Sequence, residues 1–305
     1  MSGFVWVTQY AQVIGLLLPV FVCAGIGAGW ALMKKTYPNE FISVLVTSVT
    51  TPALVFHTIV STELDDALLL QILLATLLAI AVMAGFGAIM LRMARLPVIT
   101  LLPTATFPNA GNLGLPIAHL AFGDIGLAVA VSVFTILSIT QHTLGVWLLS
   151  WSGRAAGSQK RKWPVSVAVA CTAAVVLRFV EIPLPAPVLA SADLVGSLTV
   201  PLMLLSLGYA LATVSRSSIK AGSVVGGIRL ASGALAAVVI TGLLNLPPMV
   251  AAALALQLLM PVAVVIYLYT ERYTNVGATS AGAVLVSTAV FFVISPLLIA
   301  WVGGG

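Results

Sequence analysis

The sequence predicts an all-α polytopic membrane protein of ten transmembrane helices. The helices are expected to form two inverted five-helix repeats, with broken crossover helices 4 and 9. The first observation behind this prediction is composition: 61% of the 305 residues are hydrophobic, 7% are charged and the mean hydropathy is +1.17. A water-soluble fold needs a more strongly charged surface. The other two observations are the regular spacing of apolar runs and the proline interruptions at matching places in the two halves.

Ten apolar runs set the number of predicted spans. Each run is close to the roughly 20 residues that a helix needs to cross the hydrocarbon core of a bilayer. The predicted spans 1 to 10 cover residues 11–33, 40–60, 67–91, 97–121, 125–151, 163–180, 188–213, 221–244, 247–269 and 277–302.

The basic residues set the predicted orientation. Eleven of the thirteen lysines and arginines lie in alternate connections: Lys34, Lys35, Arg92, Arg95, Arg154, Lys160, Arg161, Lys162, Arg216, Lys220 and Arg272. This side is expected to be cytoplasmic, in a cytoplasmic (inner) membrane, and ten spans then put both termini outside. Because the basic residues separate apolar runs, they indicate a lipid bilayer as partner and not a nucleic acid.

The two halves of the chain repeat each other weakly. Thr51-Pro52 in span 2 is echoed by Val200-Pro201 in span 7, and Pro108 in span 4 by Pro261 in span 9. Because five spans is an odd number, the second half must be inverted relative to the first. We therefore expect a first repeat over residues 1–151, a cytoplasmic linker over 152–162 and a second repeat over 163–305.

The most informative stretch is Thr106-Phe-Pro-Asn-Ala-Gly-Asn-Leu-Gly-Leu-Pro116 in span 4. Two prolines, two glycines and two asparagines in one span predict a broken helix, because proline removes a backbone donor. The outer half-helix would begin near Asn109, and its free N–H groups would favour an anion. Asn109, Gly111 and Asn112 are the predicted substrate-binding residues here. The alternative is a tolerated kink whose asparagines bond to neighbouring helices.

Pro261 marks a second predicted break, in span 9. Crossing it with the break at Pro108 would bring two half-helix N-termini to one point near the membrane midplane. Nearby polar residues are few, and Gln257 and Tyr267 are the candidates to line or bind there. A lone membrane proline that only kinks its helix is the alternative.

Span 5 and the two proline echoes supply the remaining candidates. Ser138, Gln141 and His142 fall in the inner half of span 5, where they could contact a solute, with His142 sensitive to protons. Interhelical hydrogen bonding is the alternative for all three. Thr51, Pro52 and Pro201 could line the site, or the prolines could only be packing bends of spans 2 and 7 in the scaffold of the protein.

Other chemistry is not expected. The three histidines have no metal-ligand spacing, and the sequence has no phosphate-binding loop and no catalytic arrangement, so we expect no metal, no cofactor and no enzyme activity. No acidic residue falls deep in a span, which disfavours a carboxylate relay for sodium or protons. Arg229, about two turns into span 8, is expected to pair with a partner or to reach the cytoplasmic face.

These residues resemble the auxin efflux carrier family in its bacterial, malate/malonate-permease form. The matching pieces are residues 51–56, 108–116, Met260-Pro261 leading to 271–273, and Ser287-Thr288. The resemblance implies a fold like that of the bile-acid/sodium symporters, with a scaffold of spans 1, 2, 6 and 7, often dimeric. Spans 3–5 and 8–10 would form a transport domain.

The resemblance also implies residue roles and a function. Pro108 and Pro261 become the crossover prolines, and Asn109, Asn112 and Gln141 become ligand-binding amides. Together with the composition, this predicts a secondary transporter of a small organic anion, such as an auxin-like monocarboxylate or a malate/malonate-like dicarboxylate. A sodium-coupled organic-anion symporter is the runner-up, although apolar residues 262–265 after Pro261 disfavour a sodium site there. A non-transporting membrane receptor is a further alternative.

Overall fold

The computed structural model describes residues 18–19, 21–61, 66–152, 169–170, 172–174, 176–177, 180, 184–213 and 216–303. This part of the chain is helical apart from its connections and one isolated antiparallel bridge. Five of its helices are long and apolar enough to cross a membrane: Leu68–Met93, Ile125–Ser152, Ala186–Tyr209, Ser217–Leu243 and Gly277–Ser295.

The other predicted spans take different forms. A shorter apolar helix at Phe21–Leu32 falls in span 1, and spans 2, 4 and 9 are built from shorter helical pieces. Most of span 6 lies outside the described residues. The ten-span count and the inverted repeat therefore remain predictions, while the all-helical class is confirmed for the described chain.

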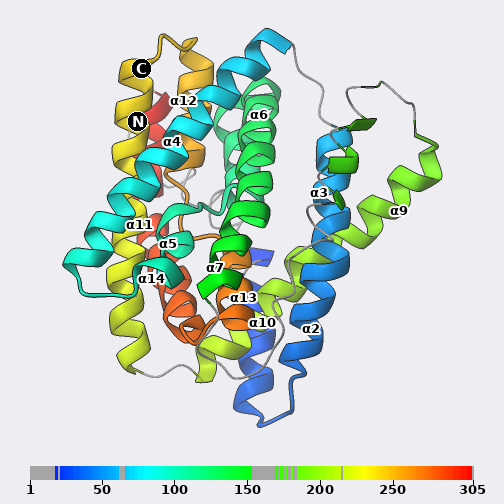
Figure 1. Cartoon of the computed structure of the whole chain (residues 1–305), viewed down its shortest axis with the longest axis vertical. Helices are drawn as coiled ribbons and strands as arrows, with labels where there is room; N and C mark the ends of the chain where they lie inside the picture. Colours follow the sequence, from blue (N-terminus) through cyan, green and yellow to red (C-terminus); the bar gives the residue numbers. More distant parts are fainter. Residues whose placement is uncertain are drawn as a thin grey trace, which may run out of the picture.

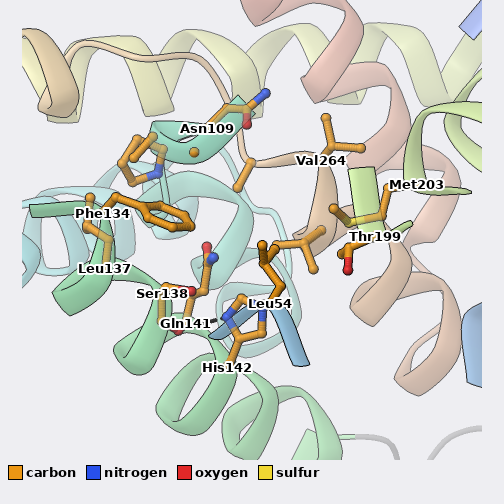
Figure 2. A pocket seen from close by; sticks show the side chains of 15 residues that line it. Leu54, Asn109, Phe134, Leu137, Ser138, Gln141, His142, Thr199, Met203 and Val264 are labelled. Atoms are coloured by element: carbon orange, nitrogen blue, oxygen red, sulfur yellow. Dashed lines mark hydrogen bonds between the residues drawn. The ribbon is translucent and has the colours of Figure 1, made fainter. Parts of the chain in front are cut away.

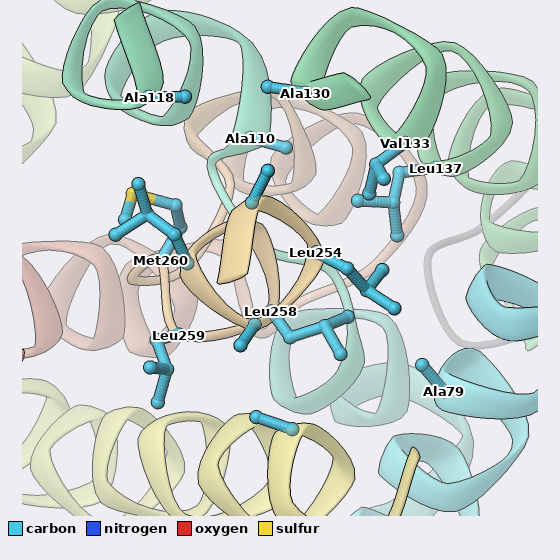
Figure 3. Packing of buried hydrophobic residues seen from close by; sticks show 14 of the residues in the cluster. Ala79, Ala110, Ala118, Ala130, Val133, Leu137, Leu254, Leu258, Leu259 and Met260 are labelled. Carbon is cyan, nitrogen blue, oxygen red and sulfur yellow. The ribbon is translucent and has the colours of Figure 1, made fainter. Parts of the chain in front are cut away.

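One bundle holds most of the described helices (Figure 1). Within it, α11 (Arg216–Leu243) packs against both α4 (Asp66–Met93) and α14 (Gly277–Gly303). α12 (Pro248–Leu258) packs against α6 (Leu115–Thr140). Figure 3 shows the apolar core at the end of α12, where Leu254, Leu258, Leu259 and Met260 are packed among Ala79, Ala110, Ala118, Ala130, Val133 and Leu137.

A second group of helices lies along one side of this bundle. Span 2 consists of α2 (Asn39–Leu45), the π-helical turn η1 (Val46–Thr50) and α3 (Thr51–Val60). Span 7 consists of α9 (Ala186–Ser197) and α10 (Thr199–Thr213). α3 packs against α9, and both stand apart from α4 and α11 in Figure 1.

Two glycines bring α10 and the Phe21–Leu32 helix into close contact. A Cβ at Gly27 would overlap the Leu205 carbonyl oxygen, and one at Gly208 would overlap the Ala24 carbonyl oxygen. Small residues at such positions let two membrane helices approach backbone to backbone.

Spans 4 and 5 are joined by a sharp turn inside α6. Gly123 lies there at φ 64° and ψ −156°, a backbone conformation that glycine adopts without a Cβ penalty. After this turn, span 5 continues through the π-helical turn η3 (Gln141–Gly145) into α7 (Val146–Ser152).

Spans 4 and 9 are both interrupted at their prolines. In span 4, α5 (Val98–Thr106) ends and the π-helical turn η2 (Ala110–Gly114) begins after an extended segment. In span 9, α12 ends at Leu258 and α13 (Val264–Tyr273) begins after a second extended segment. The interruptions occur where the sequence predicts them, because proline cannot continue the hydrogen-bond ladder of a helix.

Candidate functional site

The two extended segments cross and pair with each other. Pro108 and Val262 face each other in an antiparallel bridge. The Asn109 N–H donates to the Pro261 carbonyl oxygen at 2.7 Å, and the Ala263 N–H donates to the Phe107 carbonyl oxygen at 3.0 Å. Backbone groups that leave a helix at membrane depth need partners inside the protein, and the crossing supplies them.

The crossing places two helix N-termini at one point. η2 begins after Asn109 and α13 begins after Ala263, and neither has a side-chain cap. The first N–H groups of a helix lack intrahelical acceptors and carry partial positive charge. Residues from both beginnings line the same cavity, and no lysine or arginine is among its lining residues, so these N–H groups are the source of positive charge that the helices offer to a ligand there.

The cavity lies between the crossing and the neighbouring helices α3 and α10, and has a volume of ≈ 40 Å³. Residues 108–111 and 263–265 form the crossing side, and Leu54, Thr199 and Met203 form the opposite side. Figure 2 shows Ser138, Gln141 and His142 entering from one helical stretch, with Thr199 and Met203 across from them. The site is thus shared between two groups of helices.

Three buried polar atoms in the cavity wall have no hydrogen-bond partner among the described residues. They are Ser138 Oγ, Gln141 Oε1 and Thr199 Oγ1, in side chains 2%, 6% and 1% exposed. An unsatisfied buried polar atom costs about 1–3 kcal/mol, so proteins retain few of them. These three are among the ten such atoms in the described residues, and they are the ones that a ligand in this cavity could reach.

His142 is held by local contacts. Its Nδ1 lies 2.7 Å from the Ser138 carbonyl oxygen, which can only accept, so Nδ1 carries a proton. Its ring meets Tyr269 edge-on, with the ring centroids 5.7 Å apart. The imidazole is therefore fixed in orientation at the edge of the cavity.

The structure brings together six of the residues that the sequence singled out. Pro108, Asn109, Gly111, Ser138, Gln141 and His142 all line the cavity. Gly111 lies close to Phe134, and a Cβ there would come within 2.7 Å of the ring, so a larger residue would make that side chain shift. The backbone of Asn112 lies in η2, but its side chain is outside the described part of the chain.

The other predicted residues do not line this cavity. Pro261 lies in the crossing itself, where its carbonyl accepts from Asn109. Tyr267 is fully buried, and its hydroxyl donates to the Ser206 carbonyl oxygen at 3.4 Å. Gln257 is also fully buried, on the η2 side, where a Cβ at Gly114 would strike its amide.

Thr51 and the two prolines that recur in spans 2 and 7 also lie outside the cavity. Thr51 and Pro52 are buried at the start of α3, and Pro201 is exposed on α10. Leu54 of α3 and Thr199 of α10 line the cavity in their place.

Thr199 is the polar lining residue that the sequence reasoning missed. A signal for it exists, because the 149-residue offset between Pro52 and Pro201 also pairs Thr50 with Thr199. Both threonines are 1% exposed. Phe134, Met203 and Val264 were missed as well, since apolar residues in a membrane span carry no signal that separates lining from packing.

Comparison with known proteins assigns the family. A family model described as "Membrane transport protein", that of the auxin efflux carrier family, matches residues 12–166, just over half of the chain. The match covers the whole span 4 motif and the Ser138–His142 stretch. No curated protein matches the chain. The chain therefore belongs to the membrane transport protein family of auxin efflux carriers, and it is a membrane transporter.

Proposed function

We propose that the protein is a secondary transporter of a small organic anion, with a carboxylate as the bound group. The observation that carries this proposal is the meeting of two helix N-termini at a cavity with unpaired polar side chains. A helix N-terminus attracts negative charge, and two of them facing one cavity reinforce each other.

The lining residues suit a carboxylate head with a less polar body. Backbone N–H groups at the beginnings of η2 and α13 donate to its oxygens, and the Gln141 amide and the Ser138 and Thr199 hydroxyls add directed hydrogen bonds. Leu54 of α3 and Phe134 of α6 offer apolar contact in the same cavity. An auxin-like monocarboxylate or a malate/malonate-like dicarboxylate has this chemistry.

The size of the cavity bears on the transport cycle. A volume of ≈ 40 Å³ holds about three water molecules, enough for a carboxylate head but small for a whole substrate. Since α3 and α10 form one wall, moving them away from the crossing enlarges the site. We propose that alternating access uses this motion, with a scaffold of spans 1, 2, 6 and 7 and a transport domain of spans 3–5 and 8–10.

The arrangement in the membrane is part of the same proposal. The protein lies in the cytoplasmic membrane with both termini outside, and scaffold helices form a homodimer. Cysteine accessibility at the two ends of α4 tests the orientation, and crosslinking between scaffold helices tests the dimer.

Thermal unfolding of the purified protein tests the substrate class. Malonate, malate and indole-3-acetate are compared at two pH values, with sodium or with choline as the cation. A ligand that binds only the folded protein raises the melting temperature, and uncharged amides of the same acids serve as controls. Stabilisation by a carboxylate and not by its amide supports the proposal, and no response to any acid contradicts it. Flux into proteoliposomes then separates a transporter from a receptor.

A further inference from the structure

The far side of the crossing contains a buried positive charge. Arg229 of α11 is 0% exposed, and among the lysines, arginines, aspartates and glutamates whose side chains the structure describes it is the only one that is buried. Of the two sequence-based alternatives, pairing with a partner is the one that the structure shows: Arg229 donates to neutral groups of the protein and does not reach the surface. A buried charge in a membrane span is costly, so its placement calls for a function.

The guanidinium binds the end of α12. Arg229 Nη2 donates to the carbonyl oxygen of Leu258, the last residue of that helix, at 2.6 Å. Nη1 donates to Ser232 Oγ at 3.2 Å and lies 3.4 Å from the Met83 sulfur. The last carbonyls of a helix have no intrahelical donors and carry partial negative charge, which a cation offsets.

The same contact chain reaches the end of α5. Ser232 Oγ lies 3.1 Å from the carbonyl oxygen of Ala105, in the last turn of that helix, and 2.8 Å from the Arg229 carbonyl oxygen, and its single proton is shared between these two acceptors. Arg229 and Ser232 therefore join the C-terminal ends of both interrupted helices from one turn of α11. The positive poles of the second half-helices face the cavity, and the negative poles of the first half-helices face Arg229.

The backbone of α11 is shaped for this arrangement. A Cβ at Gly233 would overlap the Leu258 carbonyl oxygen and come within 2.8 Å of Arg229 Nη1. At Gly227 of the same helix, nothing lies within 4 Å of an added Cβ. The absence of a side chain at Gly233 lets the end of α12 and the guanidinium pack against α11.

We propose that Arg229 is a built-in counter-charge that takes the place of a coupling cation. In transporters with broken helices, half-helix C-termini and unwound carbonyls are the groups that coordinate sodium or a proton. Here a guanidinium fixed to α11 binds those groups, so an anion can bind without a co-transported sodium ion. Arg229 acts on the substrate through the crossing and is a positioning residue. This inference rests on the proposed function, because it assumes that an anion binds at the cavity.

The test measures carboxylate affinity in wild-type protein and in Arg229 variants, in sodium and in choline. The probes are malonate and indole-3-acetate. The affinity of the wild type is expected to be equal in the two cations. Arg229→Gln is expected to weaken binding about tenfold or more. Arg229→Lys keeps the positive charge and is expected to retain most of the wild-type affinity. Arg92→Gln removes a charge at the exposed end of α4 and serves as the control.

A second pair of variants covers the case in which Arg229→Gln does not fold. Gly233→Ala displaces the guanidinium without removing it and is expected to weaken binding, whereas Gly227→Ala is expected to leave it unchanged. Sodium-dependent binding in the wild type, or Arg229→Gln binding as tightly as wild type, overturns the inference while leaving the proposed function intact. If the wild type binds neither acid, in sodium or in choline, both the inference about Arg229 and the proposed function are overturned.

Discussion

Replacing Gln141 with leucine separates binding from stability. Leucine keeps a side chain of similar size and removes the amide that faces the cavity. A hydrogen bond to a charged group contributes about 1.5–3 kcal/mol, so its loss should weaken carboxylate binding by about 10- to 150-fold.

Although Gln141→Leu should weaken binding, it should leave the stability of the ligand-free protein unchanged or raise it. The Gln141 side chain is 6% exposed and its Oε1 has no partner among the described residues. Leaving such an atom unsatisfied costs about 1–3 kcal/mol, and leucine has no polar atom to satisfy. The free energy of unfolding of the ligand-free protein should therefore stay equal or rise by up to about that amount.

The assay is a carboxylate titration of the purified variant, together with its thermal unfolding midpoint without ligand. Thr143→Val is the matched control in the same stretch, because the Thr143 hydroxyl already donates to the Ile139 carbonyl oxygen and does not line the cavity. Wild-type affinity in Gln141→Leu would refute the placement of the ligand. A clear loss of stability would refute the reasoning that the amide is held unsatisfied for binding.

Three further substitutions test the site and its supporting helices. Thr199→Val should weaken carboxylate binding by about tenfold or less without lowering the unfolding midpoint, measured in the same titration. Asn112→Ala should strongly reduce carboxylate uptake into proteoliposomes while the yield of folded protein is retained; unchanged uptake would exclude its predicted role. Gly27→Ala should destabilise the protein by about 1–3 kcal/mol through overlap with Leu205, whereas Gly29→Ala, with open space around its Cβ, should be neutral or slightly stabilising in thermal unfolding.

Much of the candidate site could be predicted because the signals are local. The structure has breaks at Pro108 and Pro261, where the sequence predicts them, whereas Pro103 and Pro201 lie inside α5 and α10 without ending either helix. Asn109 and Gly111 belong to the same short motif, so they reach the cavity together with Pro108. Gln141 and Ser138 are separated by three residues, which puts them on one face of their helix.

Other residues could not be placed from sequence, because their neighbours come from distant parts of the chain. Tyr267 is only six residues after Pro261, yet its hydroxyl bonds to Ser206 of α10. Gln257 contacts Gly114 of η2. Rotation of a helix about its axis decides which cavity a side chain enters, and in a uniformly apolar span the hydrophobic pattern does not specify that rotation.

By itself, the sequence determined that this is a helical membrane protein. It also determined where spans 4 and 9 are interrupted and which short stretches contain side-chain amides. These properties follow from apolar content and from short motifs, such as the proline, glycine and asparagine residues of 106–116, that can be recognised without any tertiary contact. Only the tertiary structure decided that the breaks pair at Pro108 and Val262, that Thr199 completes the cavity and that Arg229 lies behind the crossing. The physical reason is that each depends on contacts between helices far apart in the chain, and the pairing of the breaks and the placement of Arg229 both supply partners to backbone groups that a helix leaves unsatisfied.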